Sequence, residues 1–241
     1  MDYGIQLYSV RDLAEKNLEE AVSRVAALGY SSVEFAGFFG HTPQQVCEML
    51  EKNGLRVSST HSGFDDLVNN YEETVAYHKA IGNKLYIIPG YDLSSQEKLD
   101  WFIERANPLY ERLAADGITL AYHNHAREFI VNEDGSFIYD QLLYRTKLKL
   151  EVDTYWAYVG MKNPIKLLKR VADRLVCIHI KDGSADGNGE PLGRGTAPVE
   201  TVYRYAAENN IPMVVESETC KPDGITEAKI CIEYLRSLEK R

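Results

Sequence analysis

The segment LKLEVDTYWAYVGMKNPIKLLKRVADRLVCIHIKD, residues 148–182, decides the fold class. It begins with an apolar, β-rich run at 148–154 and continues through a run with helical periodicity at 163–173. It ends in a second β-rich run at 175–182. Two such runs on either side of a helical pattern predict a strand–helix–strand unit, in which the two strands are parallel.

The same alternation extends over the whole chain of 241 residues. Further runs typical of strands lie at 4–9, 31–37, 55–61, 83–90, 118–125 and 212–218. Runs with helical periodicity lie at 18–29, 69–81, 94–116, 136–145, 198–209 and 225–238. A further helix is predicted to begin at residue 42. Thr42, Pro43 and Gln45 predict a capped helix start, and Ser94 with Glu97 predicts the start of a long helix bent at Pro108.

Eight strands and eight helices in strict alternation predict an α/β protein, a closed (β/α)8 TIM barrel with a parallel eight-stranded sheet. No linker-like composition divides the chain, so we expect a single domain over residues 1–241. A doubly wound open sheet is the alternative. That fold would need a glycine-rich phosphate turn after the first strand, where this chain has YSVRD at 8–12.

The composition indicates which kinds of binding partner and which cellular compartment to expect. The net charge is −9 and no run of Lys or Arg forms a stripe, which argues against nucleic acid as a partner. The four cysteines lie far apart without a CxxC pair, which is typical of a reduced, intracellular protein. We find no charged-then-apolar leader and no apolar run of membrane-spanning length, so we expect a cytoplasmic protein without a membrane partner.

Polar residues gather where four predicted strands end, which is where a barrel of this type places its active site. Residues two apart share one strand face, so both members of each polar pair point the same way. Inward charge is costly unless it is paired or coordinated, so these side chains predict a divalent-metal site. Mixed histidine and carboxylate donors suit manganese, zinc, iron or cobalt, with magnesium as a further option. The pairs are His123 and His125, Glu151 and Asp153, His179 and Lys181, and Glu216 and Glu218.

Three further histidines lie away from these pairs. His61 ends the third predicted strand and is a candidate for the same rim. His41 falls in a loop and His78 on a polar helix face, so we expect both at the surface.

The segment after the seventh predicted strand begins like a calcium-binding EF-hand loop. Asp182, Ser184 and Asp186 have the right spacing, but Gly193 stands where the bidentate Glu should be. We therefore expect a mobile glycine-rich loop above the rim, with Arg194 as a candidate contact for a substrate oxygen.

Five motifs in this chain are similar to those of a known family. They are AYHNH (121–125), EVDTYW (151–156), HIKD (179–182), VVESE (214–218) and GIQLYSVR (4–11). By them the chain resembles the xylose isomerase-like barrel superfamily, in its branch of sugar phosphate isomerases and epimerases, over nearly its whole length.

The resemblance implies one divalent metal ion, held by a Glu, an Asp, a His and a second Glu at the ends of strands five to eight. Asp153, His179 and Glu216 match three of these positions by motif. His123 stands where the first Glu is expected, and Trp156 stands where epimerases often have a His.

Epimerases of this type use two metal-bound glutamates on opposite faces of the sugar, one to remove a proton and one to return it. With His123 in one of these positions, Glu216 is the expected acid/base. Lys181 and Glu218 are the further catalytic candidates. The residues expected to contact the substrate are His125, His61, Arg194, Trp156 and Tyr8.

The resemblance predicts a metal-dependent isomerase or epimerase that acts on a sugar or sugar phosphate through an enediolate. Alternatives are a lyase or hydrolase of 3-keto-glycosides on the same metal site, and a non-catalytic sugar-binding barrel subunit. The acidic charge and the scarcity of further His and Glu ligands argue against an activity like that of endonuclease IV. Barrel relatives often pair, which leaves a homodimer open.

Overall fold

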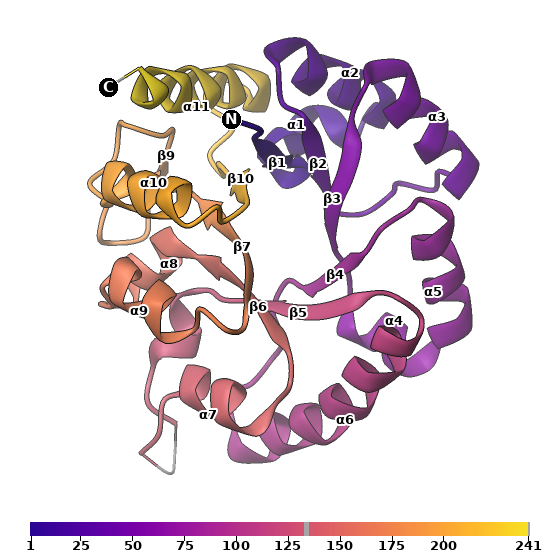
Figure 1. Cartoon of the computed structure of the whole chain (residues 1–241), viewed down its shortest axis with the longest axis vertical. Helices are drawn as coiled ribbons and strands as arrows, with labels where there is room; N and C mark the ends of the chain where they lie inside the picture. Colours follow the sequence, from indigo (N-terminus) through magenta and orange to yellow (C-terminus); the bar gives the residue numbers. More distant parts are fainter. Residues whose placement is uncertain (133–134, 241) are drawn as a thin grey trace.

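A computed structural model, which describes residues 1–132 and 135–240, forms a closed barrel of eight parallel strands (Figure 1). Around the barrel the strands follow the order β1-β10-β7-β6-β5-β4-β3-β2. The predicted (β/α)8 fold is therefore confirmed. The strands are β1 (Gly4–Gln6), β2 (Ser32–Phe35), β3 (Arg56–His61), β4 (Leu85–Ile88), β5 (Thr119–His123), β6 (Lys149–Asp153), β7 (Leu175–Ile180) and β10 (Met213–Val215).

One principal helix follows each strand and packs on the outside of the barrel (Figure 1). Each helix buries one apolar stripe against the strands, as the helical periodicity predicts. In the described part of the chain, no helix is both long and apolar enough to span a bilayer. The helices are α2 (Leu18–Leu28), α3 (Pro43–Asn53), α5 (Tyr71–Ala80), α6 (Gln96–Ala115), α7 (Ile138–Arg145), α9 (Pro164–Arg170), α10 (Val199–Glu208) and α11 (Gly224–Glu239).

Shorter elements, which the periodicity did not predict, follow the C-terminal ends of five strands. They build up the same end of the barrel that carries the polar pairs. They are η1 (Leu7–Val10) with α1 (Arg11–Ala14), α4 (Phe64–Asn69), η2 (Ala126–Phe129), α8 (Thr154–Val159) and the hairpin of β8 (Asp182–Gly183) with β9 (Gly189–Glu190).

Two predicted helices begin one or two residues later in the structure than the sequence pattern indicated. The helix expected at 69–81 corresponds to α5, and Asn70 separates it from the shorter α4, which the sequence pattern did not predict. The long helix α6 starts after Ser95, whose side chain accepts the Lys98 N–H. Ser94 lies outside the helix, and its hydroxyl donates to Asp92 Oδ1 at 2.6 Å. The predicted capping box of α3 is confirmed, and α6 continues past Pro108.

The barrel interior changes character along its axis. Ile87, Ala121 and Cys177 form a small apolar cluster of their own inside the barrel. Two residues further along the same strands stand His123 and His179, which share the inward face because strand side chains alternate. The interior is therefore apolar at one level and ionisable at the next, towards the C-terminal ends.

The prediction that His78 is a surface residue is wrong. His78 lies on α5 and is only 3% exposed. Its ring packs edge-on against Tyr86 of β4, with 4.7 Å between ring centroids. The polar residues around it in the sequence suggested an exposed helix face, but His78 lies on the side of α5 that covers the barrel.

Candidate active site

The four residues predicted to bind a metal come together at the C-terminal end of the barrel. His123 and Asp153 are the last residues of β5 and β6, His179 lies on β7, and Glu216 directly follows β10. Parallel pairing sets Asp153 beside His179, and one possible ligand atom from each of the four lies within 4.8 Å of the others. All four are buried. We call these four residues the ligand ring.

The ligand ring has a carboxylate oxygen that lacks a partner. Oδ1 of Asp153 accepts the Trp156 N–H at 2.7 Å, whereas Oδ2 is buried and makes no hydrogen bond. Burial raises the pKa of Asp153 to about 7, because the carboxylate has lost its water. An unsatisfied buried acceptor is costly, and a cation would satisfy it. The two imidazoles and two carboxylates therefore fit a divalent metal ion.

Two buried carboxylates below the ligand ring orient its histidines. His123 Nδ1 lies 3.0 Å from Glu151 Oε2. His179 Nε2 lies 2.7 Å from Glu34 Oε1 and 3.2 Å from Glu151 Oε1. This leaves His123 Nε2 and His179 Nδ1 for the ring, and the latter lies 3.3 Å from Glu216 Oε2. Such carboxylate–histidine pairs select the tautomer and the orientation of metal-binding imidazoles.

The two histidines of the ligand ring differ in charge. Burial lowers the pKa of His123 well below its usual value, so this imidazole is neutral. Burial acts in the same direction on His179, but the nearby Glu151, Glu34 and Glu216 outweigh it and raise the pKa of His179. A protonated imidazole has no free lone pair, so an ion that binds to the ring must displace a proton from His179.

The expectation that few further His and Glu residues surround the ring is wrong. Glu34 and Glu151 have no exposed surface, and His61 Nε2 lies 2.7 Å from Glu151 and 3.2 Å from Glu34. His61 and Glu151 also form a second candidate ion-binding group with His123 and His179. Hydrogen bonds already satisfy both carboxylates, so we assign them the positioning of the histidines. Glu34 was not predicted as a site residue. The sequence feature that could have indicated it is a charged residue within the β-rich run at 31–37.

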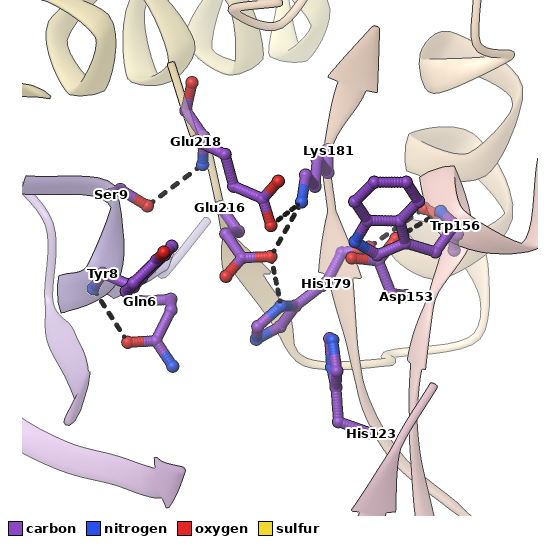
Figure 2. A network of polar contacts seen from close by, with 12 residues as sticks. Gln6, Tyr8, Ser9, His123, Asp153, Trp156, His179, Lys181, Glu216 and Glu218 are labelled. Carbon is purple, nitrogen blue, oxygen red and sulfur yellow. Dashed lines mark hydrogen bonds and ion pairs between the residues drawn. The ribbon is translucent and has the colours of Figure 1, made fainter. Parts of the chain in front are cut away.

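Lys181 lies between two carboxylates at the edge of the ring (Figure 2). Its Nζ is 3.2 Å from Glu216 Oε2 and forms an ion pair with Glu218. Burial opposes the charge on Lys181, but Glu216, Asp153 and Glu218 outweigh it and raise the pKa. Lys181 is therefore protonated at neutral pH, which suits the polarisation of an oxygen and not the removal of a proton.

Glu216 is ionised in the same environment. Burial alone would raise its pKa, but Lys181 and His179 hold the pKa of Glu216 well below its usual value. An ionised carboxylate is the form that a general base needs.

A cavity of about 610 Å3 opens above the ligand ring. Four of the residues predicted to contact the substrate line it: Tyr8, His61, His125 and Trp156. His125 Nδ1 and Trp156 Nε1 are buried and make no hydrogen bond, which leaves both atoms available to a ligand. Burial also lowers the pKa of His125 to about 4, so its imidazole is neutral at pH 7.

Arg194 is the predicted contact that the structure does not bring to this cavity. Its side chain is exposed, and it is absent from the residues that line the cavity. The loop that carries it is tied to the barrel by Asp182, whose carboxylate accepts four backbone N–H groups. They belong to Gly183, Gly193, Gly195 and Ala197, at 2.8–3.2 Å.

Arg11 lines the cavity and was not predicted. Its guanidinium donates to the carbonyl oxygens of Tyr8, at 3.0 Å, and Glu218, at 2.6 Å. It therefore joins the segments that follow β1 and β10, where the barrel closes. No spacing in the sequence singled it out, because it belongs to a short helix and not to a strand.

The fold and the site together define a parallel (β/α)8 barrel with a buried ring of histidine and carboxylate donors at its C-terminal end. The chain belongs to the xylose isomerase-like TIM barrel family, whose model matches residues 22–239.

The chain is similar to an inosose dehydratase from Clostridium botulinum, at 24% identity over 86% of this chain and 84% of that protein. Its fold matches a sugar phosphate isomerase/epimerase from Parabacteroides distasonis with a TM-score of 0.84. That match has 22% identity and covers 98% of this chain and 93% of the other. A probable 3-DHS dehydratase from Bacillus anthracis matches with a TM-score of 0.71 and 12% identity, over 97% of this chain and 99% of the other.

Proposed function

We propose that this protein is a divalent-metal-dependent enzyme that removes a proton next to the carbonyl group of a sugar or a sugar-like ketone. The observation that carries the proposal is the buried ligand ring with its unpartnered Asp153 Oδ2. Similarity to inosose dehydratases supports a substrate of this kind.

The residues of the site have different roles in proton removal. A divalent ion held by His123, Asp153, His179 and Glu216 would stabilise the negative charge that develops on the carbonyl oxygen. Glu216, which is ionised and lines the cavity, accepts the proton from carbon. Lys181 is protonated and donates a hydrogen bond to the oxygen that becomes negative.

We assign elimination as the outcome of this step. Glu216 is a carboxylate on the β10 side of the ring, whereas the β5 side offers the imidazole of His123, which Glu151 holds towards the ring. A carboxylate that returns the proton from the opposite face, as epimerisation requires, is missing at position 123. After Glu216 takes the proton, a carbon–carbon double bond forms and the neighbouring carbon–oxygen bond breaks. The departing oxygen takes up a proton and leaves as water or an alcohol.

Proton exchange with solvent tests this function directly. Metal-loaded protein is incubated in D2O with keto-cyclitols, ketoses and keto-glycosides, and the products are followed by NMR. We expect deuterium at the carbon next to the carbonyl, or an unsaturated ketone as the product. Epimerised substrate that carries deuterium would replace elimination by epimerisation. If a substrate is converted without either sign of proton transfer, the mechanism is wrong.

Glu216→Gln tests the assignment of the base. We expect exchange to slow by about 100-fold or more, the contribution typical of a general base. Metal content is measured alongside, because Glu216 also belongs to the ligand ring. Glu190→Gln, an exposed substitution on β9, is the matched control and should leave exchange unchanged.

A further inference from the structure

A second cavity, of about 430 Å3, adjoins the one above the ligand ring. The two cavities share Gly37 and His61 in their linings. The second cavity extends away from the ring, over the segments that follow β2 and β3 and along α4 and α5. Each volume is within the range of about 300–1,000 Å3 that is typical of small-molecule sites. A ligand longer than one ring can therefore reach from one cavity into the other past His61.

His78 offers this second cavity a hydrogen-bond donor. Asn83 Oδ1 accepts the Leu85 N–H at 3.2 Å, so the orientation of the amide is determined. Asn83 Nδ2 must then donate to His78 Nδ1, at 3.1 Å, and to Thr60 Oγ1, also at 3.1 Å. Because Nδ1 accepts, the proton of the neutral ring is on Nε2.

The Nε2–H group of His78 has no protein partner among the described residues. His78 is 3% exposed and lines the second cavity. Burial lowers its pKa to about 4, which agrees with a neutral ring. The Nε2–H group is therefore available to a ligand oxygen in the cavity.

The rest of the lining combines ring faces with acceptors for hydroxyl groups. Phe38 and Tyr77 pack together with 4.4 Å between their ring centroids, and both line the cavity. Asp66, Asn70 and Glu73 are exposed and supply two carboxylates and an amide. Lys and Arg are absent from the described residues of this lining, so the cavity does not suit a phosphate or a carboxylate.

We propose that the second cavity is a subsite for a second, uncharged sugar unit, so that the substrate of this site is a glycoside. The carbonyl-bearing ring lies above the ligand ring, and the second unit lies along α4 and α5. Its hydroxyl groups donate to Asp66 and Glu73, and one of its oxygens accepts from His78. This inference rests on the proposed function, because that function places the reacting sugar in the first cavity.

Binding of two lengths of ligand tests the subsite. The probes are methyl 3-keto-glucoside, which fills one cavity, and the 3-keto forms of maltose and cellobiose, which carry a second glucose. Calorimetry with metal-loaded protein gives their dissociation constants. We expect at least one keto-disaccharide to bind about tenfold or more tightly than the methyl glycoside, a difference that two hydrogen bonds to charged groups readily provide.

Two variants locate the origin of this preference. The double variant Asp66→Ala/Glu73→Ala removes exposed side chains and should retain its fold, and His78→Phe removes the Nε2–H donor. Both should lose most of the preference for the disaccharide while they bind methyl 3-keto-glucoside as the wild type does. Thermal unfolding checks the fold of each. Glu51→Ala, an exposed substitution on α3 outside both linings, should keep the full preference.

The results separate the subsite from the proposed function. Disaccharides that bind no more tightly than the methyl glycoside, or a preference that survives in both variants, would overturn the subsite. Proton exchange on the methyl glycoside without any length preference would overturn the subsite alone. A length preference that the variants abolish, without proton transfer on any probe, supports the subsite and overturns the proposed function.

Discussion

Among single residues, Glu151 determines how the histidines of the ligand ring are presented. Its two oxygens contact His123, His61, His179 and the thiol of Cys177. Burial alone would raise the pKa of Glu151, but the histidines hold it well below its usual value, so the carboxylate is ionised. An ionised carboxylate accepts from the histidines and therefore directs their other nitrogens towards the ring.

We expect Glu151→Gln to lower the affinity of the ring for a divalent ion by about 10- to 100-fold, which is typical for a residue that orients a metal ligand. The amide can donate to His123 Nδ1 and so favour the wrong tautomer. Competition with a coloured chelator measures the affinity. Glu218→Gln is the control, because Glu218 pairs with Lys181 and lies outside the ring. Equal losses in both variants would contradict the positioning role of Glu151.

His78 makes the stability of the protein depend on pH. Burial lowers its pKa to about 4 in the folded protein, whereas an unfolded His titrates at about 6.5. Between these values the unfolded chain binds the additional proton. The contribution of His78 to stability is thus complete above pH 6.5 and is lost as the pH falls towards 4.

Comparison of wild type with His78→Gln isolates this effect, because the other titrating groups are common to both. From neutral pH to about pH 4, the wild type should lose up to about 3 kcal/mol more of its free energy of unfolding than the variant. Urea denaturation at several pH values gives these free energies. Parallel pH profiles of the two proteins would show that His78 is not the titrating group.

Prediction from sequence was most successful for residues whose spacing carries the information. His123, Asp153 and His179 were placed on one inward face because strand side chains alternate, and the structure brings them together with Glu216. His78 was misplaced because its neighbours in the sequence are polar, and only packing on β4 shows which side of α5 is covered. The prediction that Arg194 contacts the substrate was unsuccessful because it depended on the path of a loop, which residue spacing does not determine.

At the scale of elements, the connection after β7 depends on Asp182. This residue is 2% exposed, and its carboxylate collects four backbone N–H groups from residues 183–197. Gly195 must be a glycine here, since a Cβ atom would lie 2.2 Å from Asp182 Oδ1. The carboxylate and the glycine together hold the loop against the barrel.

Asp182→Ala should lower the free energy of unfolding by about 3 kcal/mol, because it leaves several buried N–H groups without an acceptor. It should also increase proteolytic cleavage between residues 183 and 197. Thermal unfolding and limited proteolysis measure the two effects. Asp186→Ala in the same loop, where the side chain is exposed, should change stability by less than about 0.5 kcal/mol. Similar losses in the two variants would refute this role of Asp182.

Elements with sustained periodicity were predictable, and short ones were not. Each of the eight strands appeared as a β-rich run, but the runs extend past the last ladder pair because the polar residues at their ends leave the sheet. α8 was missed because TYWAYV, residues 154–159, follows a strand directly and is too short to show helical periodicity. α4 was missed because it has only six residues, which is too few to show helical periodicity, and it ends directly before α5.

At the scale of the whole molecule, a metal ion in the ligand ring would link four of the eight barrel strands to one another. The ligand ring takes one residue from each of β5, β6 and β7 and one from the end of β10, which are four consecutive strands around the barrel. An unfolded chain does not hold these residues together. A metal ion that binds to the ligand ring therefore also stabilises the closed sheet against unfolding.

Addition of Mn2+, Zn2+ or Co2+ to chelator-treated protein should raise the melting temperature. At a free ion concentration about 100 times the dissociation constant, the gain is about 2.7 kcal/mol, or roughly 5–10 °C for a chain of this size. Differential scanning calorimetry measures it. His179→Ala should show no such rise, whereas the exposed substitution Glu51→Ala should show all of it. A full rise in His179→Ala would place the ion elsewhere.

His179 also provides a way to observe the site from within. Its Nε2–H lies between Glu34 and Glu151, where no side chain is exposed to water. A proton so enclosed exchanges slowly and resonates far downfield in a proton NMR spectrum. The same ring offers Nδ1 to an ion, so paramagnetic Co2+ would shift that resonance strongly and diamagnetic Zn2+ only slightly. One imidazole proton can thus report which ion the barrel holds, without any substrate.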